Sequence, residues 1–157
     1  MKFEAEVNAL QRTPMFQGVD PSRLRLLAFM GEDRTFKDGE MVVRQGDSSD
    51  SAYLILSGKA DVIVEFGGRA STVAQLGESE VFGEMAMLCE TPRTATVRAT
   101  GELRTLLFER EGMLRLLREF PEMAIEMSRS LAQRLERTTM ELARMRAGSS
   151  ADASSGA

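Results

Sequence analysis

The chain has 157 residues, of which 43% are hydrophobic, and this size and composition suit one globular domain with an additional helix. Its formal net charge of −4 argues against DNA binding by this chain alone. The sequence contains no histidine and a single cysteine, which excludes histidine-based catalysis, histidine metal sites and an internal disulfide.

The sequence shows no membrane or export signal. No apolar run reaches the roughly 18 residues that a transmembrane helix needs. The N-terminal segment MKFEAEVNALQR is mixed in polarity and has no signal-peptide core. A single cysteine also fits a reducing compartment. We therefore expect a cytoplasmic protein without membrane contact.

Short helices are expected before the first strands. Residues 2–11 could form a short helix with its apolar residues on one side, and Pro14 ends it. A second helix is expected to begin at Asp20, whose side chain suits the N-cap, with Pro21 at the first helical position. Gly31 is expected to close this helix.

From about residue 32 to residue 109 the sequence changes to short apolar runs separated by turns. The turn glycines include Gly39, Gly46, Gly58 and Gly77, and the glycine pair at residues 67–68 suits a two-residue hairpin. Roughly eight short strands in this rhythm predict a closed antiparallel β-roll, or jelly roll. The predicted fold class is α+β, with short N-terminal helices and a long C-terminal helix.

The stretch FGEMAMLCETPRTATV, residues 82–97, combines features that suit an anion with a neighbouring hydroxyl group. Gly83 precedes one short helical turn, where free backbone N–H groups can bind an anion and the missing side chain permits close approach. Arg93 supplies a planar fork of donors suited to phosphate. Glu84 would repel phosphate, but its carboxylate can accept hydrogen bonds from sugar hydroxyls. This set matches a ribose phosphate.

The pattern Phe-Gly-Glu-x-x-x-Leu, followed by Pro-Arg-Thr-Ala-Thr-Val, resembles the phosphate-binding cassette of the cyclic nucleotide-binding domain family. The resemblance implies that Arg93 binds the cyclic phosphate, while Glu84 and the Gly83 backbone bind the ribose 2′-OH. It also implies further phosphate contacts within the cassette. These come from Thr94 and from the backbone N–H groups of Met85 and Ala86.

Pro121 begins a long helix that is expected to run to about residue 146. The expected domain is therefore residues 1–146, and residues 147–157, rich in Ser, Ala and Gly, are expected to form a disordered tail. A stripe with alternating four- and three-residue spacing follows the helix over three heptads. It consists of Ala124, Ser128, Leu131, Leu135, Thr138, Leu142 and Met145. This period predicts a homodimer through residues 124–145, although the stripe could also pack on its own domain.

The late part of this helix resembles the catabolite activator protein branch of the family. Thr138 and Thr139 match a hydroxyl pair that in this branch contacts the adenine of cyclic AMP, one hydroxyl from each subunit. Arg134 falls where the branch has another basic residue near the ligand. Val62 and Val73 are further candidate contacts to the sugar or base. The alternatives are a threonine pair facing solvent or a neighbour, and core packing for either valine.

The catabolite activator protein branch continues into a helix-turn-helix DNA-binding domain, whereas the resemblance here covers about residues 12–146. The initial methionine and the long tail favour a complete small protein. The alternative is a sensor excised from a larger regulator, channel or kinase.

We therefore predict a non-catalytic cyclic nucleotide receptor, with no catalytic residue, no metal site, no nucleic acid partner and an unidentified downstream protein. The threonine pair favours cyclic AMP as the ligand. Cyclic GMP is the alternative, because in the family a threonine directly after the cassette arginine, here Thr94, can hydrogen-bond guanine. Two other hypotheses are a ligand-binding fragment of a larger transcription regulator or channel, and a dimerisation module with a vestigial pocket.

Overall fold

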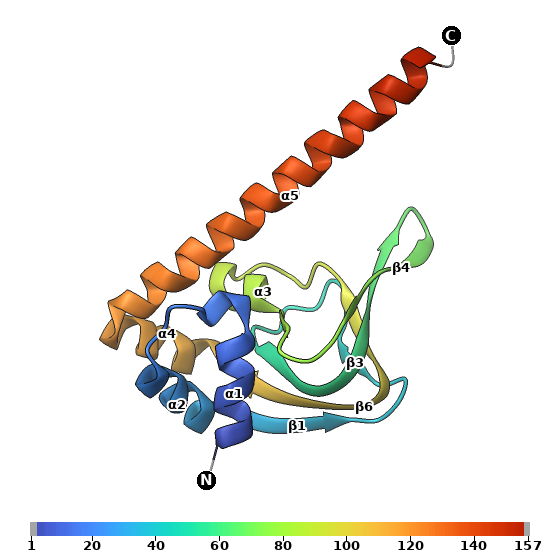
Figure 1. The fold of residues 1–157 in the computed structure, drawn as a ribbon. Coiled ribbons are helices and arrows are strands. Elements are labelled where there is room, and N and C mark those ends of the chain that lie inside the picture. Colours follow the sequence, from blue (N-terminus) through green and yellow to red (C-terminus); the bar gives the residue numbers. More distant parts are fainter. Residues whose placement is uncertain (1–2, 156–157) are drawn as a thin grey trace.

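In the computed structural model, a curved antiparallel sheet lies against a group of short helices, and one long helix leaves the domain (Figure 1). The structure describes the backbone of residues 3–155 and the side chains of residues 3–148. The helical elements are α1 (Glu4–Arg12), the 3₁₀ turn η1 (Pro14–Phe16), α2 (Pro21–Met30), α3 (Glu84–Cys89), α4 (Arg110–Glu119) and α5 (Pro121–Ser155). The strands are β1 (Glu32–Phe36), β2 (Met41–Val43), β3 (Ala52–Phe66), β4 (Arg69–Leu76), β5 (Val81–Phe82) and β6 (Thr96–Phe108). The predicted α+β class is confirmed.

The second helix begins and ends at the predicted residues. The Asp20 carboxylate accepts a hydrogen bond of 2.9 Å from the backbone N–H of Ser22, and hydrogen bonds from Ser22 lower the pKa of Asp20. Gly31 closes the helix with an extended backbone, φ −69° and ψ 150°, instead of a left-handed turn. A Cβ at Gly31 would collide with the Leu106 side chain, so close packing requires the glycine.

The sheet contains fewer and longer strands than the sequence predicts. Its order is β1-β6-β3-β4, with β2 paired to β6 and β5 paired to β3, which makes six strands among the described residues. The prediction of roughly eight strands is wrong because β3 and β6 each span two of the predicted runs. Gly58 is not a turn between strands: it lies inside β3 with φ +95°, where the pairing with β6 shifts register.

Two hydrophobic clusters hold the domain together. The first joins the N-terminal helices, α4 and the start of α5 to one side of the sheet, and includes Leu10, Leu54 and Leu106. The second lies among the strands and includes Tyr53 and Phe82. The rings of these two residues stack with centroids 5.1 Å apart. Since Phe82 immediately precedes Gly83, this stack holds the start of the cassette against β3.

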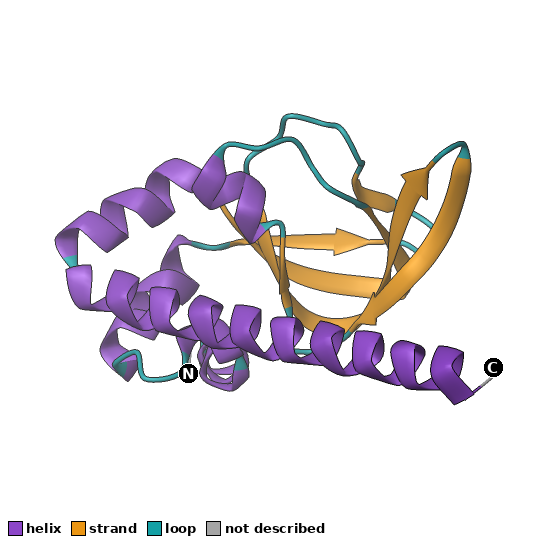
Figure 2. Cartoon of the chain, turned by 90° about the horizontal axis from the view of Figure 1, so that it is seen from above, coloured by secondary structure: helices purple, strands orange, loops and turns teal. Residues whose placement is uncertain are grey.

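Only the first turns of α5 pack against the rest of the domain. Met123 and Met127 are buried, and the Ser130 hydroxyl donates a hydrogen bond of 2.6 Å to the Pro14 carbonyl. From residue 132 to residue 148 every side chain is exposed. Figure 1 shows the C-terminal end of α5 projecting away from the domain, and in Figure 2 the helix runs along the length of the molecule.

The long helix does not end near residue 146 but continues to Ser155 in the structure. The disordered tail expected for residues 147–157 stays a prediction. The added segment contains Ala147, Ala151 and Ala153 and no proline. Alanine is the best helix former, and the single Gly148 costs only about 1 kcal/mol relative to alanine. Residues 156–157 lie outside the described part of the chain.

Candidate functional site

The cassette begins at a backbone position that only glycine can occupy. Gly83 is the N-cap of α3 and has φ +83°. A Cβ built there would lie 2.8 Å from the Ser51 carbonyl oxygen and would also collide with the Arg93 guanidinium. Both the positive φ and the close approach therefore require the absence of a side chain. No side chain caps this end of α3, so its first N–H groups keep their donor capacity.

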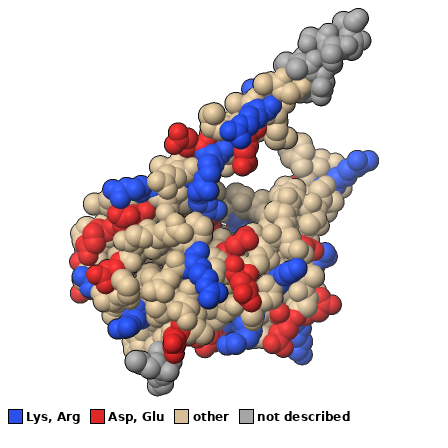
Figure 3. Space-filling model, in the orientation of Figure 1, with Lys and Arg blue, Asp and Glu red and all other residues tan. Residues whose placement is uncertain are grey.

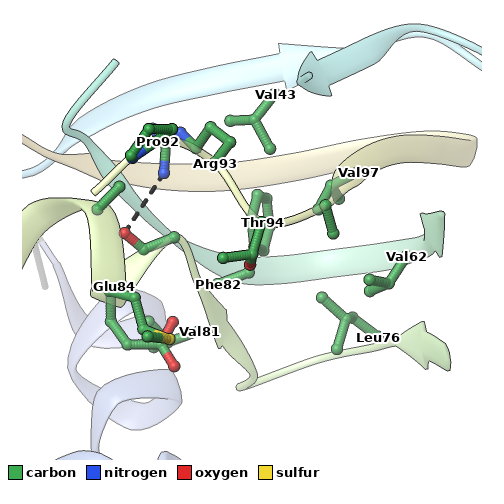
Figure 4. A pocket seen from close by; sticks show the side chains of 14 residues that line it. Val43, Val62, Leu76, Val81, Phe82, Glu84, Pro92, Arg93, Thr94 and Val97 are labelled. Carbon is green, nitrogen blue, oxygen red and sulfur yellow. Dashed lines mark hydrogen bonds between the residues drawn. The ribbon is translucent and has the colours of Figure 1, made fainter. Parts of the chain in front are cut away.

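Arg93 lies almost completely inside the domain, with 5% of its surface exposed. Its Nε–H donates to Ser49 Oγ at 3.0 Å, and its Nη1 donates to the Gly83 carbonyl at 3.3 Å, the bond dashed in Figure 4. Among the described residues, Nη2 has no hydrogen-bond partner although it is buried. A buried guanidinium with one unused nitrogen is a donor prepared for an anion.

Burial lowers the pKa of Arg93, and the nearby Tyr53, Asp50 and Asp47 oppose that shift. Arginine nonetheless remains protonated in proteins, because its ordinary pKa lies far above neutrality. The site therefore holds a desolvated positive charge, and such a charge binds an anion more strongly than an exposed one does.

The loop of residues 46–51 forms the wall behind Arg93. The backbone N–H of Gly46 donates to the Arg93 carbonyl at 2.8 Å, and the Arg93 N–H donates to the Asp47 carbonyl at 2.8 Å. Ser49 and Ser51 of the same loop contact the guanidinium and the Gly83 backbone position, respectively. Three hydrogen bonds thus fix Arg93 relative to this loop, and the Ser51 carbonyl adds a close approach to Gly83.

A pocket of about 210 Å³ opens in front of these groups. Its polar side chains are Glu84, Arg93 and Thr94, and the rest of its lining is apolar. Figure 4 shows Val62, Leu76 and Val97 grouped away from Arg93 and Glu84, so one end of the pocket is polar and the other apolar. The full lining is Val43, Val62, Leu76, Val81, Phe82, Gly83, Glu84, Met85, Ala86, Pro92, Arg93, Thr94, Ala95 and Val97. Such a pocket suits a ligand with a charged group at one end and an apolar ring at the other.

Helix α5 reaches the polar end of this pocket through one ion pair. Arg134 Nη1 lies 3.8 Å from Glu84 Oε1. The Glu84 side chain is 18% exposed and that of Arg134 is 45% exposed, so the pair lies partly in solvent. A pair of this kind contributes little to stability. It nevertheless joins the carboxylate assigned to the ribose directly to the long helix.

The structure brings six of the ten candidate residues together in the pocket lining: Gly83, Glu84, Met85, Ala86, Arg93 and Thr94. Arg134 lies next to them through its contact with Glu84. Thr138 and Thr139 are exposed and do not line the pocket. Their hydroxyls donate to carbonyls of their own helix, those of Arg134 and Leu135, at 3.0 and 2.9 Å.

Val73 does not line the pocket and is not packed in the core, since 60% of its surface is exposed. The pairing of β3 with β4 passes from Val62 opposite Ala74 to Ile63 opposite Thr72. Val73 is therefore the extra residue of a β-bulge. The alternation that sequence reasoning relies on is interrupted at this position.

Several residues around the site carry no signal in the sequence. Ser49 and Asp47 lie in the loop before β3, and the hydrogen bond between Arg93 and Ser49 joins residues 44 positions apart. The valine and leucine lining has no sequence signal beyond ordinary strand hydrophobicity. The sequence Gln45-Gly46-Asp47 marks a turn but does not indicate what the turn contacts.

The curved antiparallel sheet, the short cassette helix and the buried arginine define a ligand-binding domain for a phosphorylated compound. Residues 33–120 match the cyclic nucleotide-binding domain family, and the chain belongs to this family. Among the described residues, no helix combines the length and hydropathy needed to cross a membrane.

Known relatives share both sequence and fold with this chain. The cyclic AMP receptor protein of Thermus thermophilus is 34% identical over 134 residues, which are 85% of this chain and 62% of that protein. The crystal structure of the Thermus thermophilus catabolite activator protein has a TM-score of 0.76 at 33% identity, covering 85% of this chain and 63% of that chain. The N-terminal domain of a Streptomyces coelicolor transcriptional regulator has a TM-score of 0.75 at 30% identity, covering 83% of this chain and 94% of that domain. The chain thus spans less than two thirds of the Thermus proteins and most of the Streptomyces domain.

Proposed function

We propose that this chain is a non-catalytic receptor for a cyclic nucleotide and that cyclic AMP is its ligand. The observation that carries the proposal is the buried Arg93, whose Nη2 has no hydrogen-bond partner among the described residues and which lines a pocket together with Glu84 and the uncapped start of α3. The phosphate would accept from Arg93 and from the backbone N–H groups of Met85 and Ala86. The Glu84 carboxylate would accept from the ribose 2′-OH, and the apolar end of the pocket would receive the base.

The polar side chains of the pocket support binding without catalysis. Glu84, Arg93 and Thr94 can hold a phosphate and a sugar, whereas hydrolysis of a phosphodiester needs an activated water or nucleophile aligned with the phosphorus. In this proposal Glu84 is occupied by the ribose and Arg93 by the phosphate. The ligand would therefore be bound and released without chemical change.

The choice of cyclic AMP rests on the relatives named for it and on the Thr138–Thr139 pair. Both threonines lie outside the pocket lining of a single chain. They would reach the base only after α5 moves or a second chain approaches. Cyclic GMP remains the competing ligand because Thr94 lines the pocket. Its hydroxyl lies in the cassette itself and needs no rearrangement to meet a guanine.

A homodimer through α5 is part of the proposal. Leu135, Leu142 and Met145 are 68%, 55% and 71% exposed and belong to one heptad stripe. Pairing with the same stripe of a second copy would bury these side chains, and burying a leucine contributes about 1.5–3 kcal/mol. The effect of the ligand would reach this heptad stripe through Glu84 and Arg134. The ligand would bind more tightly to the protein with α5 in one position than in another.

A ligand-binding fragment of a larger transcription regulator is the second candidate, favoured by the 62% coverage of the Thermus receptor protein. Figure 3 shows acidic and basic side chains interspersed on the face in view. Such a surface, together with the net charge of −4, predicts no shift of DNA in a gel assay at low salt.

Isothermal titration of the chain with cyclic AMP and with cyclic GMP tests the proposal. Arg93→Leu should weaken binding at least about 100-fold, because it removes the charged hydrogen bonds to the phosphate. Arg104→Leu, which removes an exposed arginine that does not line the pocket, is the matched control and should leave the affinity unchanged. Equal affinity of Arg93→Leu and the unchanged chain would show that the assigned site is wrong. Tighter binding of cyclic GMP would reverse the choice of ligand.

A further inference from the structure

Ser49 makes the contact that sets the direction of the Arg93 fork. The Nε–H of Arg93 donates to Ser49 Oγ at 3.0 Å, while Nη1 donates to the Gly83 carbonyl at 3.3 Å. These bonds use two of the three guanidinium nitrogens, and Nη2 is the one that stays buried without a partner among the described residues. Because a guanidinium is planar, two fixed nitrogens determine where the third one points.

The loop that carries Ser49 is itself tied to Arg93. Backbone hydrogen bonds of 2.8 Å run in both directions, from Gly46 to the Arg93 carbonyl and from Arg93 to the Asp47 carbonyl. These two bonds hold the backbone just before Ser49 against Arg93, which keeps the Ser49 hydroxyl next to the guanidinium. A side chain held in this way reduces the rotamer freedom that Arg93 would otherwise lose on binding a ligand.

We propose that Ser49 is a positioning residue for the anion site, which holds Arg93 in its binding direction without cancelling its charge. This inference rests on the proposed function, since it concerns how Arg93 meets the ligand phosphate. A hydroxyl oxygen accepts one hydrogen bond from Nε and carries no charge. A carboxylate at the same position would orient the fork equally well, but it would also neutralise the charge that attracts the phosphate.

The charges around the site make the neutral partner important. Asp47 and Asp50 are near enough for their charges to raise the pKa of Arg93 against the effect of burial. Among the described residues the Arg93 side chain forms no salt bridge with either of them, and its hydrogen bonds are to neutral oxygens. A third acid in direct contact would weaken anion binding in a pocket that already contains Glu84.

Three substitutions at Ser49 separate the effect of orienting Arg93 from the effect of a charge at residue 49. Ser49→Ala removes the Nε partner and should weaken cyclic AMP binding about tenfold, the usual effect of losing a hydrogen bond to a charged group. Ser49→Thr keeps a hydroxyl and should restore affinity to within about twofold. Ser49→Asp keeps the contact but adds a charge, and should weaken binding more than Ser49→Ala does. Ser48→Ala, at the exposed neighbouring serine, is the matched control and should change nothing.

A second readout follows Arg93 without any ligand. In a ¹⁵N spectrum, the Nε–H signal that disappears in Arg93→Leu belongs to Arg93. This signal should exchange slowly with water in the unchanged chain, Ser49→Thr and Ser49→Asp, and rapidly in Ser49→Ala. A substitution that merely loosened the fold would also lower the melting temperature, which should stay constant across the series.

The outcomes are distinguishable. If the unchanged chain binds cyclic AMP and Ser49→Ala binds it equally well, the inference is overturned and the proposed function stands. If Ser49→Asp binds as tightly as the unchanged chain, the requirement for a neutral partner is wrong. If the unchanged chain binds neither cyclic nucleotide, the proposed function fails, and the role of Ser49 in ligand binding fails with it. Should Ser49→Ala not fold, Ser49→Val, which matches threonine in shape but lacks the hydroxyl, replaces it in the comparison with Ser49→Thr.

Discussion

The anion end of the pocket and the distal half of α5 differ in how many contacts their side chains make within one chain. Around Arg93, every element is held by others: Gly83 fits against Ser51, and the loop of residues 46–51 is hydrogen-bonded to the arginine backbone. Along α5 after residue 131, the side chains through residue 148 are exposed and the leucines have no partner.

This difference separates a region whose contacts are complete within one chain from a region with an exposed apolar stripe. The proposed phosphate site is preorganised, because its donors are fixed before a ligand arrives. The proposed α5 interface fits the rule that large exposed apolar patches mark interaction sites. The Glu84–Arg134 pair is the ion pair that joins the two regions in the described structure.

The largest effect is expected when the apolar stripe is broken. Leu135→Glu combined with Leu142→Glu should convert a dimer into a monomer, weakening association by at least about a thousandfold, because four leucines lose their burial per dimer. Sedimentation equilibrium measures the change. Gln133→Glu with Met140→Glu adds the same charge on the opposite side of the helix and should leave the dimer intact. If the unchanged chain is itself a monomer, the proposed homodimer through α5 is wrong.

Gly83→Ala should disrupt the anion end of the pocket. The new Cβ meets the Ser51 carbonyl and the Arg93 guanidinium, so we expect a loss of about 2–4 kcal/mol in the free energy of unfolding and a large loss of cyclic AMP affinity. Gly39→Ala is the matched control. Gly39 has the same φ of +83° but no atom within 4 Å of its Cβ position. It should lose only about 1 kcal/mol and bind normally. Similar losses in both variants would mean that backbone strain alone is responsible.

Glu84→Gln tests whether the Glu84 carboxylate binds the ribose 2′-OH. The amide is a weaker acceptor than the carboxylate, so cyclic AMP affinity should fall about tenfold. The 2′-deoxy analogue of cyclic AMP lacks the hydroxyl and should bind both forms nearly equally. Calorimetry with both ligands provides the comparison, and an equal loss for the two ligands would contradict the ribose assignment.

The smallest effect concerns Asp20, which lies outside both regions. Hydrogen bonds from Ser22 hold the pKa of Asp20 below its ordinary value, so its ionised form stabilises the folded state. That contribution is present above the unfolded pKa of about 3.9 and disappears as the pH falls through the lower folded pKa. Asp20→Asn keeps a capping acceptor that does not titrate. Thermal unfolding between neutral and acidic pH should show the melting temperatures of the unchanged chain and Asp20→Asn converging at low pH. The melting temperature of Ser48→Ala should follow that of the unchanged chain at every pH.

Sequence reasoning reached the polar residues of the site because they follow one another in a short stretch. Gly83, Glu84 and Arg93 lie within eleven residues, and the backbone requirements of a helix start and a proline-ended loop are local. The helix starts at Asp20 and Pro121 were also predictable, since caps and proline act on the nearest turn.

The candidate residues of the cassette, the α+β class and the heptad stripe could be predicted because they depend on neighbours along the chain. The contact of Ser49 with Arg93, the place of Gly58 inside a continuous strand and the bulge at Val73 became visible only in the folded chain. These outcomes depend on register and packing between segments tens of residues apart, and local spacing carries no information about register. The helical course of residues 147–155 shows the same limit, because a composition rich in Ser, Ala and Gly is compatible with either a helix or a tail.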